Sequence, residues 1–166
     1  MRTKLETECS QVEGDCKYTA ETHHIIAAKR KRLGNLFQIV PAVIAALLGA
    51  AAGVDMLASP EPAVWAQAAQ ALSVISAVIA AVANVLNPFA EYADHIAAAK
   101  GFTILKHDAR SLRETFSAAM SDDTFAGAVK SLRDRYADLV RSAPETDPES
   151  FEKARKRVQS GIHERD

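Results

Sequence analysis

Residue types that bind metals recur at a regular interval near the N-terminus. Cys9, Cys16 and His23 are spaced by seven residues. Such residues share one face of a helix, but successive members lie about 10 Å apart along it, too far to share one ion or to form a disulfide. His23 and His24 are adjacent and point about 100° apart around a helix. We therefore expect no metal site and no cofactor, and we assign these positions to helix packing or to contact with solvent.

Motifs of the common enzyme classes are missing from the sequence. It has no nucleophile elbow and no glycine-rich phosphate loop, and His95, His107 and His163 stand singly. The segment HDARSLRE, residues 107–114, mixes charges at the spacing of a helix surface rather than of an acid–base pair. The formal net charge of −1 gives no indication of nucleic-acid binding. The sequence predicts a protein that is not an enzyme and has no catalytic residues.

Small and polar side chains gather on one face of an expected helix over residues 62–89. At about 100° per residue, this face collects Ala66, Ala69, Gln70, Ser73, Ala77, Ala80, Asn84 and Asn87, of which the last six are candidates for lining a pore. The opposite face is bulky and aliphatic. Two interpretations fit: either the face packs tightly against other helices, with Gln and Asn hydrogen-bonded across the contact, or it borders water in a central pore. Both require several copies of the chain, so we expect a homo-oligomer.

The helix with this face belongs to one of two uncharged runs in the sequence, which span residues 33–54 and 62–90. Each is long enough to cross the ~30 Å hydrocarbon core of a bilayer as a helix, which takes about 20 residues. A soluble protein with two buried helices is the alternative, but the rest of the chain lies mostly in charged amphipathic stretches and is too short to cover both runs. The sequence therefore predicts an all-α membrane protein, in which crossings over 33–57 and 62–89 form a transmembrane hairpin within residues 33–90.

The positive charges indicate the orientation of this hairpin. All 20 Lys and Arg residues lie outside the segment from residue 33 to residue 99. The connection DMLASPEP, residues 55–62, carries only the acidic Asp55 and Glu61. Because Lys and Arg stay on the cytoplasmic side of a membrane, we expect both termini in the cytoplasm and a short loop outside.

Glycines in the first crossing predict close helix packing. Gly49 and Gly53 form the G-x-x-x-G pattern in GAAAG, which lets another backbone approach. In an alanine-rich helix the same spacing also arises by chance, and both interpretations stay open. Pro41 favours a kink near the start of the crossing, and Gly34 separates the crossing from the preceding helix or permits a bend.

The flanking segments predict helices outside the membrane. Residues 1–32 form an N-terminal cytoplasmic amphipathic helix, and residues 91–166 form a cytoplasmic helical bundle. The first helix of the bundle is expected over about residues 91–119, and it has a packing seam that steps by three and four residues. Its members are Phe102, Leu105, Ala109, Leu112 and Phe116.

Two further helices are expected in the same segment. One spans residues 122–142 with Ser121 as its N-cap, and its apolar face carries Phe125, Val129, Leu132, Tyr136 and Leu139. The last helix opens at TDPES, where Thr146 and Glu149 fit a capping box and Pro148 suits a first turn.

Several segments together resemble a known family. YTAETHHIIAAKRKRLG leads into FQIVPAVIAALLGAAAG, and HIAAAKGFTILKHDARSLRE and LRDRYADLV follow the second crossing. This layout resembles the SLATT family of two-transmembrane effector domains, which occur beside nucleotide-synthesising and nucleotide-sensing proteins in bacterial conflict systems. The resemblance covers nearly the whole chain and rests on architecture and on a diffuse pattern around Tyr18, His23, Lys106 and Tyr136.

The resemblance implies a function as well as a fold. It implies a pore in the bacterial inner membrane that kills or arrests an infected cell when an upstream nucleotide-signalling or sensor protein triggers it. The expected partners are then membrane lipids and further copies of the chain, and not nucleic acid. A membrane-anchored helical scaffold or sensor, which recruits a soluble partner without conducting ions, is the alternative.

Overall fold

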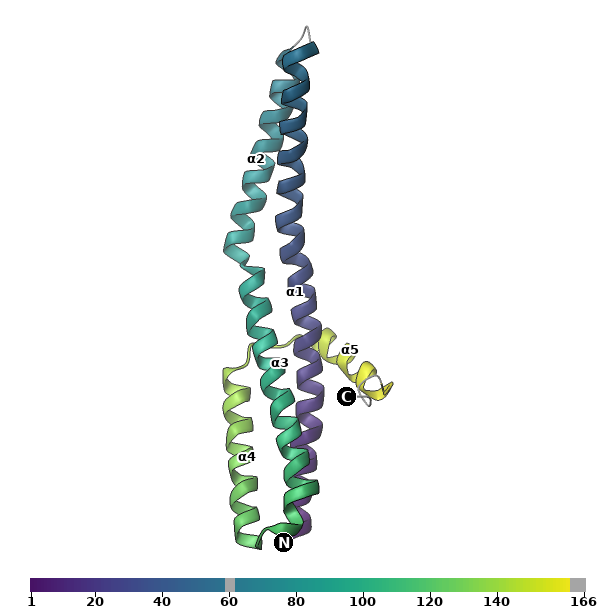
Figure 1. The fold of residues 1–166 in the computed structure, drawn as a ribbon, viewed down its shortest axis with the longest axis vertical. Coiled ribbons are helices and arrows are strands. Elements are labelled where there is room, and N and C mark those ends of the chain that lie inside the picture. Colours follow the sequence, from purple (N-terminus) through teal and green to yellow (C-terminus); the bar gives the residue numbers. More distant parts are fainter. Residues whose placement is uncertain (59–61, 162–166) are drawn as a thin grey trace. The chain divides into compact units, whose positions relative to one another are not determined.

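The chain folds into helices joined by short connections (Figure 1). A computed structural model describes the backbone of residues 1–58 and 62–161 and the side chains of residues 1–50 and 67–161. No strand occurs among these residues. The elements are α1 (Arg2–Ala58), α2 (Pro62–Leu86), α3 (Pro88–Ser111), the π-helical turn η1 (Leu112–Phe116), the 3₁₀ turn η2 (Ser117–Ala119), α4 (Asp122–Ser142) and α5 (Pro148–Gln159).

The chain divides into two compact units, which are described separately. The first, here called the head, comprises Met1–Ala28 and Tyr92–Asp166. The second, here called the hairpin, comprises Lys29–Glu91. The long helix α1 contributes its first half to the head and its second half to the hairpin, and α3 begins in the hairpin and continues in the head.

The core of the head is built from one face each of α1, α3 and α4. Its buried members are Cys9, Val12, Cys16, Ala20, Ala98, Phe102, Leu105, Ala109, Phe125, Val129 and Leu132. The α1 members recur at intervals of three and four residues, which is the period of a helix face that packs against neighbours. Tyr136 meets Phe102 edge to face, with ring centroids 6.2 Å apart. The expected seams on α3 and α4 are confirmed at their buried positions.

The seam on α3 fails at its last member. Phe116 is 49% exposed, although the spacing predicts a buried position. The cause is the π-helical turn η1, which inserts a wider turn at Leu112–Phe116 and moves the inward-facing position from Phe116 to Ser117, which is buried. The expectation that one regular helix continues to residue 119 is therefore wrong.

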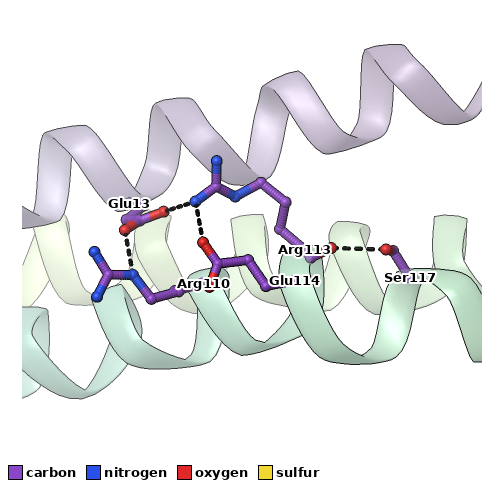
Figure 2. Close-up of polar contacts among 5 residues, drawn as sticks. All are labelled: Glu13, Arg110, Arg113, Glu114 and Ser117. Carbon is purple, nitrogen blue, oxygen red and sulfur yellow. Dashed lines mark hydrogen bonds and ion pairs between the residues drawn. The ribbon is translucent and has the colours of Figure 1, made fainter.

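Ion pairs join α1 to the turn η1 (Figure 2). The carboxylate of Glu13 accepts hydrogen bonds from Arg110 Nε at 2.9 Å and from Arg113 Nη2 at 2.8 Å. The same Arg113 nitrogen donates to Glu114 at 2.9 Å. The hydroxyl of Ser117 donates to the carbonyl oxygen of Arg113 at 2.6 Å. These contacts hold the irregular end of α3 against α1.

The last helix, α5, packs through small residues. Its buried positions Ser150, Ala154 and Val158 are four residues apart and so lie along one side of the helix. The N-cap is Asp147, whose carboxylate accepts a hydrogen bond from the backbone N–H of Ser150 at 2.7 Å. The capping box expected from Thr146 and Glu149 is therefore wrong, because the N-cap is Asp147 and the third helical residue is Ser150, while Pro148 takes the first turn as expected.

The hairpin contains no break in α1. The helix runs for 57 residues through Gly34 and Pro41. The expectation that Gly34 separates two helices is wrong, and the reason for glycine there is space. A Cβ atom at position 34 would lie 2.8 Å from the ring of Phe89. The absent side chain lets the aromatic ring pack directly on the backbone of α1.

Candidate membrane hairpin and its polar face

The surface of the hairpin is aliphatic. Large apolar side chains that are at least one-third exposed follow both helices: Leu36, Ile39, Val43, Leu47, Leu72, Val74, Ile75, Val78, Val82, Val85 and Leu86. Within the described residues, α1 and α2 each have a stretch long and apolar enough to cross a membrane, and almost none of either stretch is fully buried. A core helix of a soluble protein would bury such a stretch, and water disfavours an exposed patch of this size. The hairpin is therefore built to meet lipid.

The contact between the two helices of the hairpin uses one narrow face of each. On α2 the half-buried residues are Ala69, Ser76, Ile79 and Ala83. On α1 they are Phe37, Val40, Pro41, Ile44 and Leu48. Both sets recur at intervals close to the helical period, as expected of helices that pack along their length. The hydroxyl oxygen of Ser76 is buried in this contact and has no hydrogen-bond partner among the described residues.

The small and polar face of α2 lies beside this contact and is not covered by it. Its members in the regular helix, Gln70, Ser73, Ala77, Ala80 and Asn84, are all exposed. Among the polar side chains of this face, Ser73 makes a local hydrogen bond: its hydroxyl donates to the carbonyl oxygen of Ala69 at 2.9 Å. Packing within one hairpin therefore does not account for this face. Ala69, which the sequence pattern placed on the same face, belongs to the contact with α1.

Asn87 differs from the other candidates because it lies at a helix break. Its φ of 38° is in the left-handed region, where asparagine is better tolerated than most residues. Its backbone N–H closes the end of α2 on the carbonyl oxygen of Ala83 at 2.9 Å. Its side-chain oxygen accepts from the N–H of Ala90 at 3.4 Å, and Pro88 is the first residue of α3. Asn87 thus ends one helix and caps the next, and this role accounts for the residue type.

The base of the hairpin combines a polar recess with an ion pair. Gln38 of α1 and Asn84 and Asn87 line a cavity of about 260 Å³ next to Phe89. Arg30 on α1 and Glu91 on α3 form an ion pair of 2.6 Å. Arg30 precedes the apolar part of α1 and Glu91 follows the apolar part of α2. The ion pair therefore marks the end of the apolar surface of the hairpin on both helices.

The glycines proposed for helix packing face outward where they are described. A Cβ atom at Gly49 would meet nothing within 4 Å, so this position is not used within the hairpin. The surroundings of Gly53 lie outside the described residues. Gly49 is therefore free to approach another chain, as a helix-association motif requires.

The head holds a polar pair that the sequence did not reveal. Nδ1 of His23 on α1 lies 2.8 Å from Nδ1 of His95 on α3, so one ring donates a hydrogen bond and the other accepts it. His23 is 1% exposed and stacks on Phe102. Burial, with repulsion from His95 and His24, lowers the pKa of His23 to about 4 from its ordinary value of 6.5. His23 is therefore neutral at physiological pH, and its hydrogen bond with His95 joins α1 to α3.

The cysteines have no features of a reactive site. Both are free and fully buried in the core of the head. Burial raises the pKa of the Cys16 thiol to about 12, with a smaller contribution from Asp15. Burial also raises the pKa of Cys9. A protonated, enclosed thiol is a poor nucleophile, so the spacing that suggested a ligand series marks the core-facing side of α1.

Comparison with known proteins identifies the chain's relatives. No curated protein and no solved structure matches it. A family model described as SMODS and SLOG-associating 2TM effector domain family 4 matches residues 5–162. The match covers both units, and its two transmembrane helices agree with the exposed apolar lengths of α1 and α2. The chain therefore belongs to this family of membrane-associated, two-transmembrane effector domains.

Proposed function

We propose that several copies of this chain assemble in the bacterial inner membrane into a pore lined by the polar face of α2. In this proposal the protein is an effector without catalytic activity, and opening of the pore permeabilises the membrane during a defence response. An upstream nucleotide-signalling or sensor protein supplies the trigger.

The observation that carries the proposal is the exposure of the polar face. Gln70, Ser73 and Asn84 present amide and hydroxyl groups on a helix whose other exposed side chains are aliphatic. Uncovered polar groups at membrane depth are unfavourable against lipid, because hydrocarbon offers them no hydrogen bonds. Another copy of the hairpin or water must therefore meet this face.

The order of the faces around α2 favours water over a simple helix contact. At about 100° per residue, the contact with α1 lies roughly a quarter turn around α2 from the polar face. On the other side of the polar face lies a valine-rich face, formed by the exposed residues Val74, Val78, Val82 and Val85. In a ring of hairpins, α1 and the valines could then face neighbours and lipid while Gln70, Ala77 and Asn84 face the axis. Their seven-residue spacing places these three side chains in one line along the helix.

The chemistry of this face suits a weakly selective conduit. No charged residue occurs between residues 33–54 or 62–90, so no ring of charge is available to select ions by sign. Amide and hydroxyl groups hydrate ions without binding them tightly. Ala77 and Ala80 have small side chains, so the middle of the face stays accessible to water.

Orientation follows from the distribution of charge. The basic residues of the chain flank the apolar runs on the same side, and none lies in the connection between them. The positive-inside tendency supports an arrangement with both termini in the cytoplasm. The trigger would then act on the head from inside the cell.

The test replaces the polar groups without changing the aliphatic faces. The double variant Gln70→Leu/Asn84→Leu, reconstituted in liposomes, should lose most of the ion flux of the parent protein, because leucine dehydrates the proposed lining. The matched control is Val74→Leu/Val78→Leu, which alters exposed residues of the same helix outside the polar face and should conduct as the parent does. Both variants must oligomerise to the same extent by light scattering in detergent.

Three outcomes would contradict the pore. Unchanged flux in the Gln70/Asn84 variant would remove these residues from the conducting path. Equal loss in the control would point to a general defect of the hairpin. An oligomer that never passes current, either as the parent or as a variant, would favour the alternative of a membrane-anchored scaffold that recruits a soluble partner.

A further inference from the structure

A small groove in the head is lined by lysines and histidines from two helices. It has a volume of about 220 Å³ and lies between α1 and α3. Lys17 and His24 come from α1, and Lys106 and His107 come from α3. The remaining ionisable residue in its wall is Glu21. The groove lies wholly within the head, so its geometry does not depend on the position of the hairpin.

The two lysines are half-buried in one groove and have no acidic partner in the part of the chain that the structure describes. Within the described residues, neither Lys17 nor Lys106 makes an ion pair or a hydrogen bond, although both are half-buried. The arginines of the head are paired instead, as Arg110 is with Glu13 at 2.9 Å and Arg135 is with Asp108 at 2.8 Å. Two positive charges on one groove attract an anion more strongly than either does alone.

The acidic residue in the wall does not cancel this charge. The carboxylate of Glu21 accepts a hydrogen bond from Arg157 Nη1 of α5 at 3.0 Å, and its side chain is only 7% exposed. Arg157 therefore neutralises Glu21 from the other side. The groove keeps the full charge of the two lysines, and the exposed imidazoles of His24 and His107 add N–H groups that can donate to an anion.

We propose that this groove binds a phosphate-bearing anion between Lys17 and Lys106. Lysine ammonium groups bind phosphate as compact point charges, with short charge-assisted hydrogen bonds. The volume is below the ~300 Å³ at which pockets for drug-sized ligands begin. It therefore suits a phosphate or diphosphate group, whether free, part of a soluble metabolite or the headgroup of a lipid. This inference concerns the head and holds whether or not the hairpin conducts ions.

The test measures binding of inorganic pyrophosphate to the full chain in detergent micelles by isothermal titration calorimetry. The double variant Lys17→Gln/Lys106→Gln should bind about tenfold more weakly or worse, because two charge-assisted contacts are lost. The matched control is Lys4→Gln/Lys100→Gln, which removes two exposed lysines of the head outside the groove and the same net charge. It should bind as the parent does.

A second arm identifies the source of the phosphate. Inorganic phosphate, pyrophosphate and a nucleoside triphosphate are titrated separately, and the same variants are compared for retention of phosphatidylglycerol against phosphatidylcholine. Any of these ligands supports the proposal if its binding depends on Lys17 and Lys106 and not on Lys4 and Lys100. Absence of saturable binding to every probe, or equal loss in both double variants, would overturn it. Thermal melting of each variant by circular dichroism checks that the head remains folded.

Discussion

The head and the hairpin place the same kinds of side chain in opposite surroundings. In the head, aliphatic and aromatic residues such as Phe102 and Leu132 are buried, and charged residues form pairs at the surface. In the hairpin, leucines and valines are exposed along both helices, and the half-buried contact sets small residues of α2 such as Ala69 and Ser76 beside apolar residues of α1. A single chain can do this only if its two units meet different solvents. The head follows the burial rules of a protein in water, and the hairpin follows those of a protein in lipid.

The largest expected effect tests this difference with one substitution made in both units. Leu132→Ala in the head should lower the free energy of unfolding by about 2–5 kcal/mol, because it leaves a cavity at a side chain that is 4% exposed. Leu47→Ala in the hairpin removes the same atoms from a side chain that is 65% exposed and should cost less than about 1 kcal/mol. Denaturant unfolding of the full chain in micelles, followed by the helical circular dichroism signal, measures both.

Equal losses in these two variants would contradict the assignment of different solvents. A larger loss at Leu47 than at Leu132 would mean that Leu47 packs against another copy of the chain. Repeating the measurement over a range of protein concentrations would detect such a contact.

The second effect is an acid-dependent loss of stability of the head, caused by the buried His23. Folding lowers the pKa of His23 to about 4 from 6.5, so the unfolded chain binds a proton that the folded chain does not. The free energy of unfolding has its full value above pH 6.5. It falls as the pH drops from there to about 4, by about 3 kcal/mol in total. Melting of the full chain between pH 7.5 and pH 4.5 should show this acid destabilisation.

The control replaces His23 with glutamine, a polar side chain that does not bind a proton in this pH range. His23→Gln should flatten most of the pH dependence in this range, even if it lowers stability at neutral pH. A parent protein whose stability does not vary between pH 7.5 and pH 4.5 would contradict the lowered pKa of His23.

The smallest effect compares two ion pairs within the head. Glu13→Gln should cost about 1–2 kcal/mol, because its carboxylate is 12% exposed and holds two arginines. Asp134→Asn, which breaks an exposed pair with Lys130, should cost less than about 0.5 kcal/mol. The same unfolding assay in low and high salt distinguishes them, since salt should abolish the second effect and retain much of the first. Equal costs in low salt would show that the cluster at η1 is as weak as a surface pair.

Much of the architecture could be predicted because the sequence separates charge from apolar residues so cleanly. Two uncharged runs and periodic seams are local signals, and they indicated the helices, the hairpin and the core faces of α3 and α4. Ser121 was correct as an N-cap, since its hydroxyl accepts from the N–H of Thr124 at 3.3 Å. These features depend on residues near one another in the sequence.

The features that were missed depend on contacts between distant segments or on irregular turns. His23 and His95 are 72 residues apart, and no spacing rule brings them together. The π-helical turn η1 breaks the period that placed Phe116 in the core. Gly34 suggested a helix break, yet it makes room for Phe89, which is 55 positions later in the chain. The polar face of α2 was found from its period, but its separation from the contact with α1 required the structure.

The ion pair between Arg30 and Glu91 has a consequence for how a signal could move this protein. Because one charge stands at the end of each apolar stretch, sliding one helix past the other like a piston would pull a charge toward hydrocarbon and part the pair. The pair is half-exposed and so contributes only about 0–1 kcal/mol, but it adds to the cost of sliding and leaves tilting or rotation of both helices together without that cost.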